Sequence, residues 1–304
     1  MKQKNSGQSI FLFNQFSIVV FGAAICATVA IVILASPSFS PSPSILAAVT
    51  QKTFPFEDVN NNGIWDEGVD RDITSELLPN DWYIYFKTPN SIVIPAGIKF
   101  LRSKGDFTGY TLEAGKNLTI NSSINSVVYG GTVDLRADGN ITIGPKVTLN
   151  GRDYVTVYAD GNINLGDGSS LASRGGSANF GSITVRSEAG NISFGKKVRI
   201  TPLNELFVMA MGGDISSAPG LQISSSKDRI SFYGQQISID GSLLRAEYIT
   251  IDGSGKPLSV RNSRISVPRN GLLHISNIGS SIDIRGTILP KINDIRLSAD
   301  TVLK

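Results

Sequence analysis

A short loop rich in carboxylate and amide side chains has the residue types and spacing of a metal site. Asp58, Asn60 and Asn62 stand at alternate positions along it. Gly63 follows directly, and Asp66 adds a further carboxylate three residues later. Short oxygen-bearing side chains at this spacing, with glycine at the sharp turn, wrap a hard cation such as Ca²⁺. The predicted calcium ligands are the side chains of Asp58, Asn60, Asn62, Asp66 and Asp70 and the backbone carbonyl of Ile64.

The end of this loop leaves the last ligand open. Val69 stands where an EF-hand places its bidentate glutamate. The missing oxygen would have to come from Glu67, Asp70 or Asp72. The loop resembles calcium loops of EF-hand and dockerin type, and more closely the D-x-N-x-N-G-x-x-D loops of bacterial surface proteins. Such a loop would stiffen the lead-in to the next domain, with an affinity on the order of 10⁻⁴–10⁻³ M as in extracellular modules. The alternative is a surface turn without metal, because Asn, Asp and Gly are common in turns.

A second group of residues has the types needed for glycoside chemistry. Asp138 and Asp160 fall in matching Ala-Asp-Gly turns of adjacent repeats. Stacked repeats would place them ~4.8 Å apart in backbone, near the about 5–5.5 Å of a retaining glycosidase pair. Arg136 is the nearest basic residue. Aspartate is also common in such turns for backbone reasons, and the chain lacks the Asp-Asp and Gly-His-Gly elements of β-helical pectin hydrolases. We therefore favour binding over catalysis and keep these three residues as catalytic candidates.

A repeat of about 22 residues must position these groups. From Ser91 onward apolar residues alternate in pairs without a helical period, and Gly, Asn, Asp and Ser separate the pairs. Three pairs recur in each repeat, which is the pattern of strands that stack on their counterparts one turn later. The sequence therefore predicts an all-β, right-handed parallel β-helix of about nine turns, with three short strands per turn and an aliphatic core.

The residue that opens each turn is an amide or a carboxylate, usually after glycine. These residues are Asn117, Asn140, Asn162, Asn191, Asp214 and Gln236. We predict that they stack inward as a hydrogen-bonded ladder, and that the preceding glycines take the left-handed backbone conformation. The units ADGNITIG, ADGNINLG and EAGNISFG resemble the G-N-I-x-L/I-x-G repeats of filamentous-haemagglutinin-like exoproteins, over residues 117 to 300. The resemblance implies a secreted bacterial adhesin.

The N-terminus predicts export. Lys2 and Lys4 precede an uncharged apolar run from Phe16 to Ala35, which can enter a membrane. Residues 1–49 are either a cleaved signal peptide or an uncleaved membrane anchor, with a Pro/Ser-rich spacer. Residues 50–90 form the predicted calcium-loop and cap region, and residues 91–304 form the β-helix. Both interpretations place the rest of the chain outside the cytoplasm, at the cell surface or in the extracellular space.

The composition of the chain limits the kinds of site and partner that it can have. The single cysteine, Cys26, excludes an intrachain disulfide, and the single histidine, His274, excludes a His-rich zinc site. Residues 196–304 carry 14 basic and 9 acidic side chains, a net charge of +5, which could attract acidic glycans. Nucleic acid is not a predicted partner, because few aromatic residues interleave these charges.

These observations predict an exported structural or adhesive β-helix protein. Its expected partner is a polysaccharide or another cell-envelope component. The alternative is a carbohydrate-active enzyme, either a polysaccharide lyase or a glycoside hydrolase. No polar capping helix follows the last turn, so we also expect end-to-end self-association.

Overall fold

A computed structural model describes residues 54–77, 83–100, 109–126, 130–175, 180–292 and 294–303. The chain divides into two compact units, Met1–Thr50 and Gln51–Lys304. The predicted signal peptide or anchor, residues 1–49, lies outside the described residues. Within the described ranges, no helix has the length and apolar character needed to cross a membrane.

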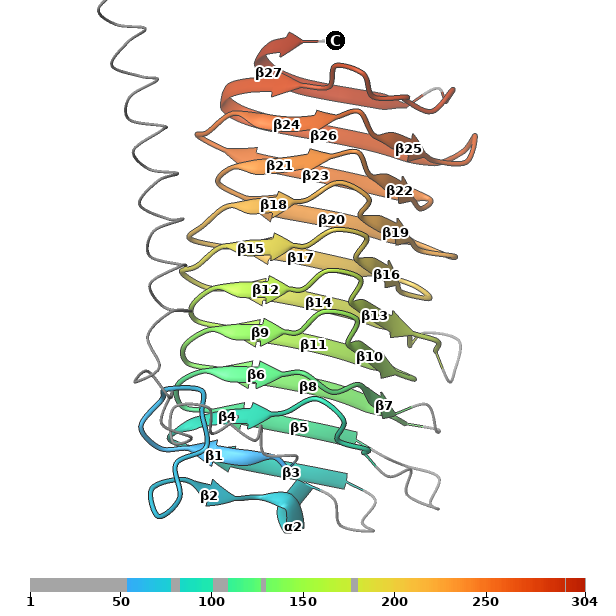
Figure 1. Cartoon of the computed structure of the whole chain (residues 1–304). Coiled ribbons are helices and arrows are strands. Elements are labelled where there is room, and N and C mark those ends of the chain that lie inside the picture. Colours follow the sequence, from blue (N-terminus) through green and yellow to red (C-terminus); the bar gives the residue numbers. More distant parts are fainter. Residues whose placement is uncertain are drawn as a thin grey trace, which may run out of the picture. The chain divides into compact units, whose positions relative to one another are not determined.

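The unit Gln51–Lys304 is a parallel β-solenoid of about nine turns, which confirms the predicted fold class (Figure 1). A complete turn has three short strands, such as β8 (Thr132–Ala137), β9 (Ile141–Ile143) and β10 (Thr148–Gly151). Each strand pairs in parallel with its counterpart in the next turn, so the turns build three ladders.

The strands of the three ladders follow one another in chain order. Ladder 1 contains β3 (Tyr83–Thr88), β5 (Gly109–Ala114), β8, β11 (Tyr154–Ala159), β14 (Ser182–Ser187), β17 (Leu206–Ala210), β20 (Arg229–Gly234) and β23 (Tyr248–Ser254). Ladder 2 contains β4 (Ser91–Ile94), β6 (Leu118–Ile120), β9, β12 (Ile163–Leu165), β15 (Ile192–Phe194), β18 (Ile215–Ser217), β21 (Ile237–Asp240) and β24 (Leu258–Arg261). Ladder 3 contains β7 (Ile124–Ser126), β10, β13 (Ser170–Ser173), β16 (Arg199–Thr201), β19 (Gln222–Ser224), β22 (Leu243–Arg245) and β25 (Arg264–Ser266). The long strands β26 (Leu272–Asp283) and β27 (Ile295–Leu303) extend ladders 1 and 2 together.

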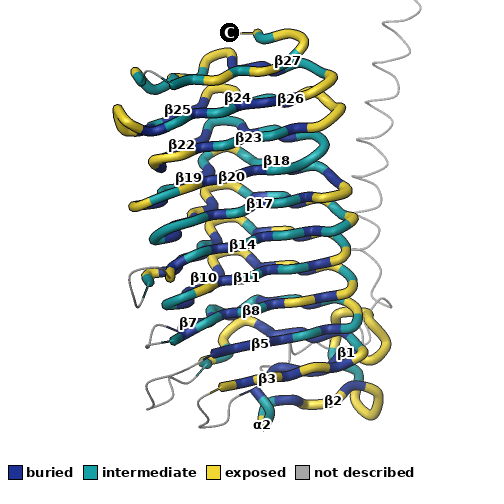
Figure 2. The backbone as a smooth tube through the Cα atoms, turned by 180° about the vertical axis from the view of Figure 1, so that it is seen from behind, coloured by how far each residue is buried: buried dark blue, intermediate teal, exposed yellow. Residues whose placement is uncertain are grey.

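The core is a stack of aliphatic side chains in register. Val133, Val155 and Ile183 are direct partners in successive turns of ladder 1, and all three have no exposed surface. Alternating burial along strands such as β8 and β11 places one set of side chains inward and the next outward (Figure 2). Because every turn repeats this register, apolar burial continues along the whole stack.

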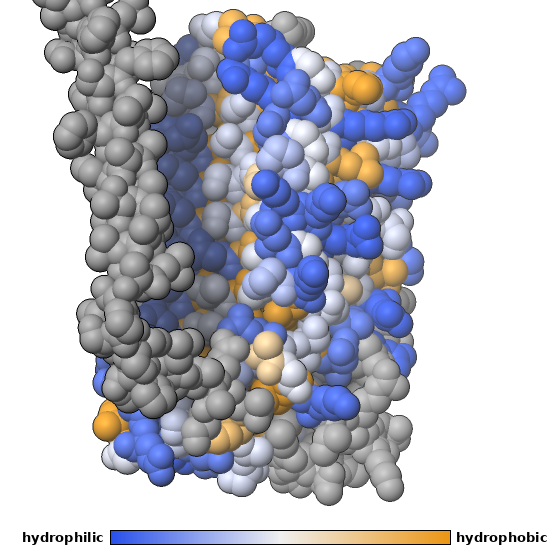
Figure 3. Space-filling view, in the orientation of Figure 1, coloured by the Kyte–Doolittle hydropathy of each residue, from blue (hydrophilic) through white to orange (hydrophobic). Residues whose placement is uncertain are grey.

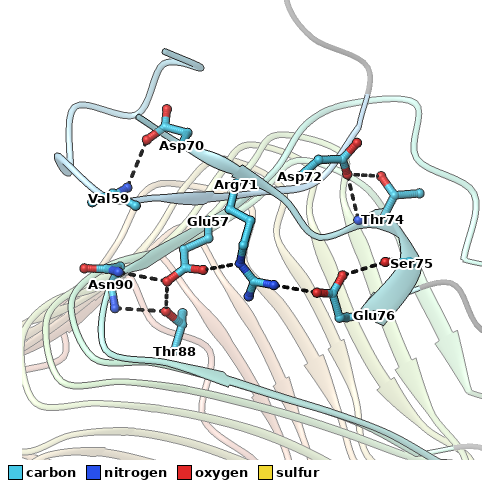
Figure 4. Close-up of polar contacts among 10 residues, drawn as sticks. All are labelled: Glu57, Val59, Asp70, Arg71, Asp72, Thr74, Ser75, Glu76, Thr88 and Asn90. Atoms are coloured by element: carbon cyan, nitrogen blue, oxygen red, sulfur yellow. Dashed lines mark hydrogen bonds and ion pairs between the residues drawn. The ribbon is translucent and has the colours of Figure 1, made fainter. Parts of the chain in front are cut away.

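An antiparallel strand and a short helix cap the N-terminal end. Strand β1 (Phe56–Asp58) pairs antiparallel with β4 and with β2 (Arg71–Asp72). Helix α2 (Thr74–Leu77) follows, and Asp72 caps it by accepting hydrogen bonds from the Thr74 amide and hydroxyl, as expected for a helix start (Figure 4). The solenoid itself begins with β3, inside the segment predicted as the cap region.

The predicted asparagine ladder is present, but at the surface. The Asn140 amide N–H donates to Asn117 Oδ1 (2.7 Å), and the Asn162 N–H donates to Asn140 Oδ1 (2.8 Å). The same bond continues through Asn191, Asp214 and Gln236. Asn140, Asn162 and Asn191 are exposed, so the expectation of an inward ladder was wrong.

The glycines before these rungs serve a different purpose from the one predicted. Neither Gly139 nor Gly161 has a positive φ. A Cβ on Gly139 would lie 2.6 Å from Asn117 Oδ1, and one on Gly161 would lie 2.7 Å from Asn140 Oδ1. Glycine is therefore required by the close approach of the ladder oxygen rather than by a left-handed backbone.

The last described strand leaves part of the core uncovered. Ile295, Leu297 and Val302 of β27 pack against the core but are only partly buried. Self-association through this end stays a prediction.

Candidate functional site

The loop between β1 and β2 brings the predicted side-chain ligands into one hydrogen-bonded group. Asp58 is 1% exposed, and its carboxylate accepts the amide N–H of Gly63 (2.7 Å) and of Asn62 (3.2 Å). Gly63 has a φ of 77°, so glycine stands where the sharp turn requires it. The carboxylate of Asp70 accepts the amide N–H of Val59 (3.0 Å) and of Asp66 (2.7 Å). Both ends of the loop are thereby tied to its middle.

The two asparagines complete this group. The side-chain amides of Asn60 and Asn62 both donate to Asp66 Oδ2, each at 2.6 Å. Their own carbonyl oxygens accept backbone N–H groups of Asn62 (3.3 Å) and Ile64 (2.8 Å), respectively. The side chains of all five predicted side-chain ligands therefore belong to one network. Ile64 joins the network through its backbone N–H, which donates to Asn62 Oδ1.

The donor chemistry of the loop suits a hard cation. Residues 58–70 contain four acidic side chains and no basic one. All available ligands are oxygens, which calcium prefers. Among the described residues, no three His, Cys, Asp or Glu side chains form a metal-holding cluster. A cation here would therefore depend on the Asn60 and Asn62 amide oxygens in addition to the carboxylates.

Of the three candidates for the last ligand, Asp70 is the one whose carboxylate is bonded to the amides of the loop. Asp72 is engaged at the start of α2, and Glu67 is exposed. Asp70 is buried and bonded to two loop amides. The local geometry therefore favours Asp70.

The loop also contacts the solenoid. Asn61 Oδ1 accepts hydrogen bonds from Asn117 Nδ2 (2.9 Å) and from the Ser91 hydroxyl. Lys116 Nζ donates to the Val59 carbonyl (3.2 Å). Asn117 is the first rung of the asparagine ladder, so the loop is bonded to the end of that ladder.

A buried glutamate holds the cap onto β3 and β4 (Figure 4). Glu57 accepts hydrogen bonds from Arg71 Nε (2.8 Å), Asn90 Nδ2 (2.8 Å) and the Thr88 hydroxyl. Burial on its own raises the pKa of Glu57, but the bonds from Thr88, Asn90 and Arg71 outweigh it and hold the pKa below its ordinary value. The charged form of Glu57 is thus the form that the folded cap stabilises.

The catalytic candidates are neighbours but do not form a catalytic group. Asp138 and Asp160 follow Ala137 and Ala159, which are register partners, and both carboxylates are exposed. Arg136 points its guanidinium at Asp134, with Nη2 2.9 Å from the carboxylate. That bond raises the pKa of Arg136 further above its ordinary value, which is the opposite of what a general base needs.

The outer face of ladder 1 carries a feature that the sequence analysis missed. Six of the chain's 8 tyrosines lie on it. They are Tyr83, Tyr85, Tyr154, Tyr158, Tyr233 and Tyr248. The sequence pattern places these tyrosines at outward positions of their strands. Only the register between distant turns shows that they share a face.

A hollow of about 510 Å³ opens on this face beside the first tyrosines. Its lining comes from four turns, and its polar residues are Lys87, Thr88, Glu113, Arg136, Asp138 and Tyr158. The Lys87 ammonium bonds Glu113 (2.9 Å) and holds the pKa of that carboxyl below its usual value. One of the three catalytic candidates, Asp160, does not line the hollow.

The basic C-terminal half is partly neutralised. Arg261 and Arg285 both bond Asp283, which holds the pKa of Asp283 well below its usual range. Arg296 bonds Asp294. Hydrophilic side chains do project along the edge formed by ladder 3, on the right in Figure 3. These paired arginines weaken the expectation that the net positive charge of residues 196–304 attracts acidic glycans.

Comparison with known proteins adds no assignment. No family model, no curated protein and no solved structure matches the chain. The resemblance to filamentous-haemagglutinin-like exoproteins, and the implied adhesin, therefore stay predictions.

Proposed function

We propose that this chain is an exported structural or adhesive solenoid of the cell surface or extracellular space, with an N-terminal cap that calcium stabilises. The observation that carries the proposal is the in-register stacking of the solenoid strands, joined to a capping loop rich in oxygen-bearing side chains. A stack of turns with a continuous aliphatic core supplies a rigid support, and its outward positions are free to vary for binding.

The cap supports the calcium part of the proposal. Asp58, Asn60, Asn62, Asp66 and Asp70 would hold the ion together with the Ile64 carbonyl. Bound calcium would offset the repulsion among the loop carboxylates and fix the loop against Asn117. Because the loop is bonded to the ladder and β1 pairs with β4, stiffening the loop would stabilise the first turns of the solenoid.

Calcium is expected to stabilise the purified full-length chain. With a dissociation constant on the order of 10⁻⁴–10⁻³ M, 10 mM Ca²⁺ would add about 1.4–2.7 kcal/mol to the free energy of unfolding. Urea unfolding in calcium and in chelator measures this difference. The double variant Asp58→Asn/Asp66→Asn should lose the response, whereas Asp134→Asn, on the outer face of β8, should keep it. An equal stability in calcium and chelator would refute a calcium-binding cap.

Export is tested through residues 1–50. Fused to a reporter enzyme that is active only outside the bacterial cytoplasm, this segment is expected to give reporter activity. Placing a charge in the apolar run, with Ile33→Asp, should abolish that activity because a charged side chain is costly in a membrane. A change in the spacer, such as Pro41→Ala, serves as the control and should leave the activity intact. An inactive fusion with the unaltered segment would contradict export.

The catalytic alternative receives less support. Arg136 is committed to Asp134, and Asp138 and Asp160 are exposed turn residues. A binding surface therefore agrees better with these contacts than a hydrolase or lyase site does.

A further inference from the structure

We propose that the outer face of the first four turns of ladder 1 binds a neutral polysaccharide, with Tyr83 and Tyr85 as stacking platforms and the adjoining hollow as an acidic hydrogen-bonding site. The inference deepens the adhesive role proposed above and rests on it, because it names the chemical class of the ligand and the residues that recognise it.

The ring of Tyr83 lies against the sheet with one face open. A Cβ on Gly109, its partner in the next turn, would come within 2.5 Å of two ring carbons, so the ring covers that glycine. The Tyr83 hydroxyl is hydrogen-bonded to the Thr111 hydroxyl at 2.5 Å. The residue is nevertheless 55% exposed. One face of the ring is therefore backed by the sheet while the other remains available to a ligand.

Tyr85 forms a second fixed platform beside it. Its hydroxyl donates to Glu113 Oε2 (3.1 Å) in the next turn, and the residue is also 55% exposed. Lys87 in turn holds Glu113 in place. Aromatic faces attract the weakly positive C–H groups of a sugar ring. Because both rings are fixed at the hydroxyl end before binding, little side-chain entropy is lost when a ligand stacks on them.

The charges around these rings favour a neutral ligand. Both cationic side chains of strands β3, β5, β8 and β11 are already paired, Lys87 with Glu113 and Arg136 with Asp134. Asp138 and Asp160 add two exposed carboxylates to these neutral pairs, so the net charge of these six side chains is −2. A polyanion would be repelled. The hydroxyl groups of a neutral sugar can donate charge-assisted hydrogen bonds to these carboxylates.

The stack also suits a chain molecule. Successive strands of a ladder are separated by about 4.8 Å, which is close to the length of one pyranose in an extended polysaccharide. A chain that lies along the stack from Tyr83 toward Tyr158 would place roughly one sugar over each turn. It would pass Glu113 and Asp138 in the hollow, whose lining spans these four turns.

Retardation of the full-length chain in native gels that contain soluble polysaccharides tests the proposal. The neutral probes are dextran, xylan, glucomannan and mixed-linkage β-glucan, and the acidic probes are polygalacturonate and alginate. We expect retardation by at least one neutral polymer and none by the acidic polymers. Tyr85→Ala should weaken the binding about tenfold, and Tyr83→Ala/Tyr85→Ala should abolish it. Tyr248→Ala, on the same face but four turns beyond Tyr158, should leave binding unchanged.

Circular dichroism and urea unfolding of each variant verify that the solenoid is intact. Asp138→Asn provides a variant in which no ring is removed, and it should weaken binding without changing stability, because its side chain is exposed. Retardation only by acidic polymers, or by none, would overturn the inference, and so would undiminished binding by a folded double tyrosine variant. New reducing ends on the polymer would overturn it in favour of catalysis. The reporter fusion and the calcium titration remain positive if only this inference fails, so the two failures are distinguishable.

Discussion

Replacing Phe232 with alanine is expected to lower the free energy of unfolding of the solenoid by about 3–5 kcal/mol. Phe232 has no exposed surface and belongs to the inward column of ladder 1. Its register partners are Val208 in the preceding turn and Ile251 in the following one. Removing the ring would leave a cavity between turns that are held in place by their strand pairing, so neighbouring side chains cannot move along the stack to fill it.

Urea unfolding followed by circular dichroism measures this effect. Phe207→Ala is the matched control, because Phe207 lies one residue after the buried Leu206 and points outward, where it is only partly buried. The control should cost far less than the core substitution. Equal losses for both variants would show that Phe232 is not part of a tightly packed column.

Replacing Glu57 with glutamine is expected to lower the free energy of unfolding by about 1.5–3 kcal/mol, the range for hydrogen bonds to charged groups. Glu57 is 8% exposed and joins β1 to Arg71, Thr88 and Asn90. Glutamine keeps the size of the side chain but removes the charge that attracts the Arg71 guanidinium. The variant therefore tests the electrostatic part of the cap without creating a cavity.

The stabilising contribution of Glu57 is expected to depend on pH. The folded pKa of Glu57 lies below the ordinary value of 4.5, so its stabilising contribution is fully present above about pH 4.5. It is lost as the pH falls through the lowered folded value, because the unfolded chain binds the proton more tightly than the folded cap does. The stability difference between the unaltered chain and Glu57→Gln should stay constant above pH 5 and shrink on acidification. A difference that grows as the pH falls would contradict the assignment.

Much of the fold could be predicted because its determinants are local and periodic. The paired apolar residues in each turn indicate inward positions, and their spacing fixes the number of turns. The hydrogen-bonded grouping of the predicted ligand side chains could be anticipated for the same reason, since Asp58 to Asp70 are close in sequence and their spacing is itself the signal. Their assembly into one hydrogen-bonded group required only the local turn at Gly63.

Features that depend on register and rotamer could not be predicted. Tyr83 and Tyr154 are far apart in sequence, and only the alignment of β3, β5, β8 and β11 puts them in one column. Arg136 could have turned toward Asp138, but its guanidinium bonds Asp134 on its own strand. The glycine of each G-N pair was recognised, but the reason predicted for it was wrong. The distance from that glycine to a ladder oxygen one turn away cannot be derived from the sequence of a single repeat.

The register of the ladders constrains how the gene for such a protein can change in length. Val155 pairs with Val133 and Ile183, and the other residues of β11 follow the same alignment. A codon lost inside β11 would turn each later side chain of that strand to the opposite face, placing Thr156 and Tyr158 in the core. Loss of the 22 residues that separate Asn140 from Asn162 would instead join two matching positions and preserve every column. Successive turns of 22 and 29 residues share one ladder, so extra residues fit between strands, whereas the length of the stack itself changes only when a whole turn is gained or lost.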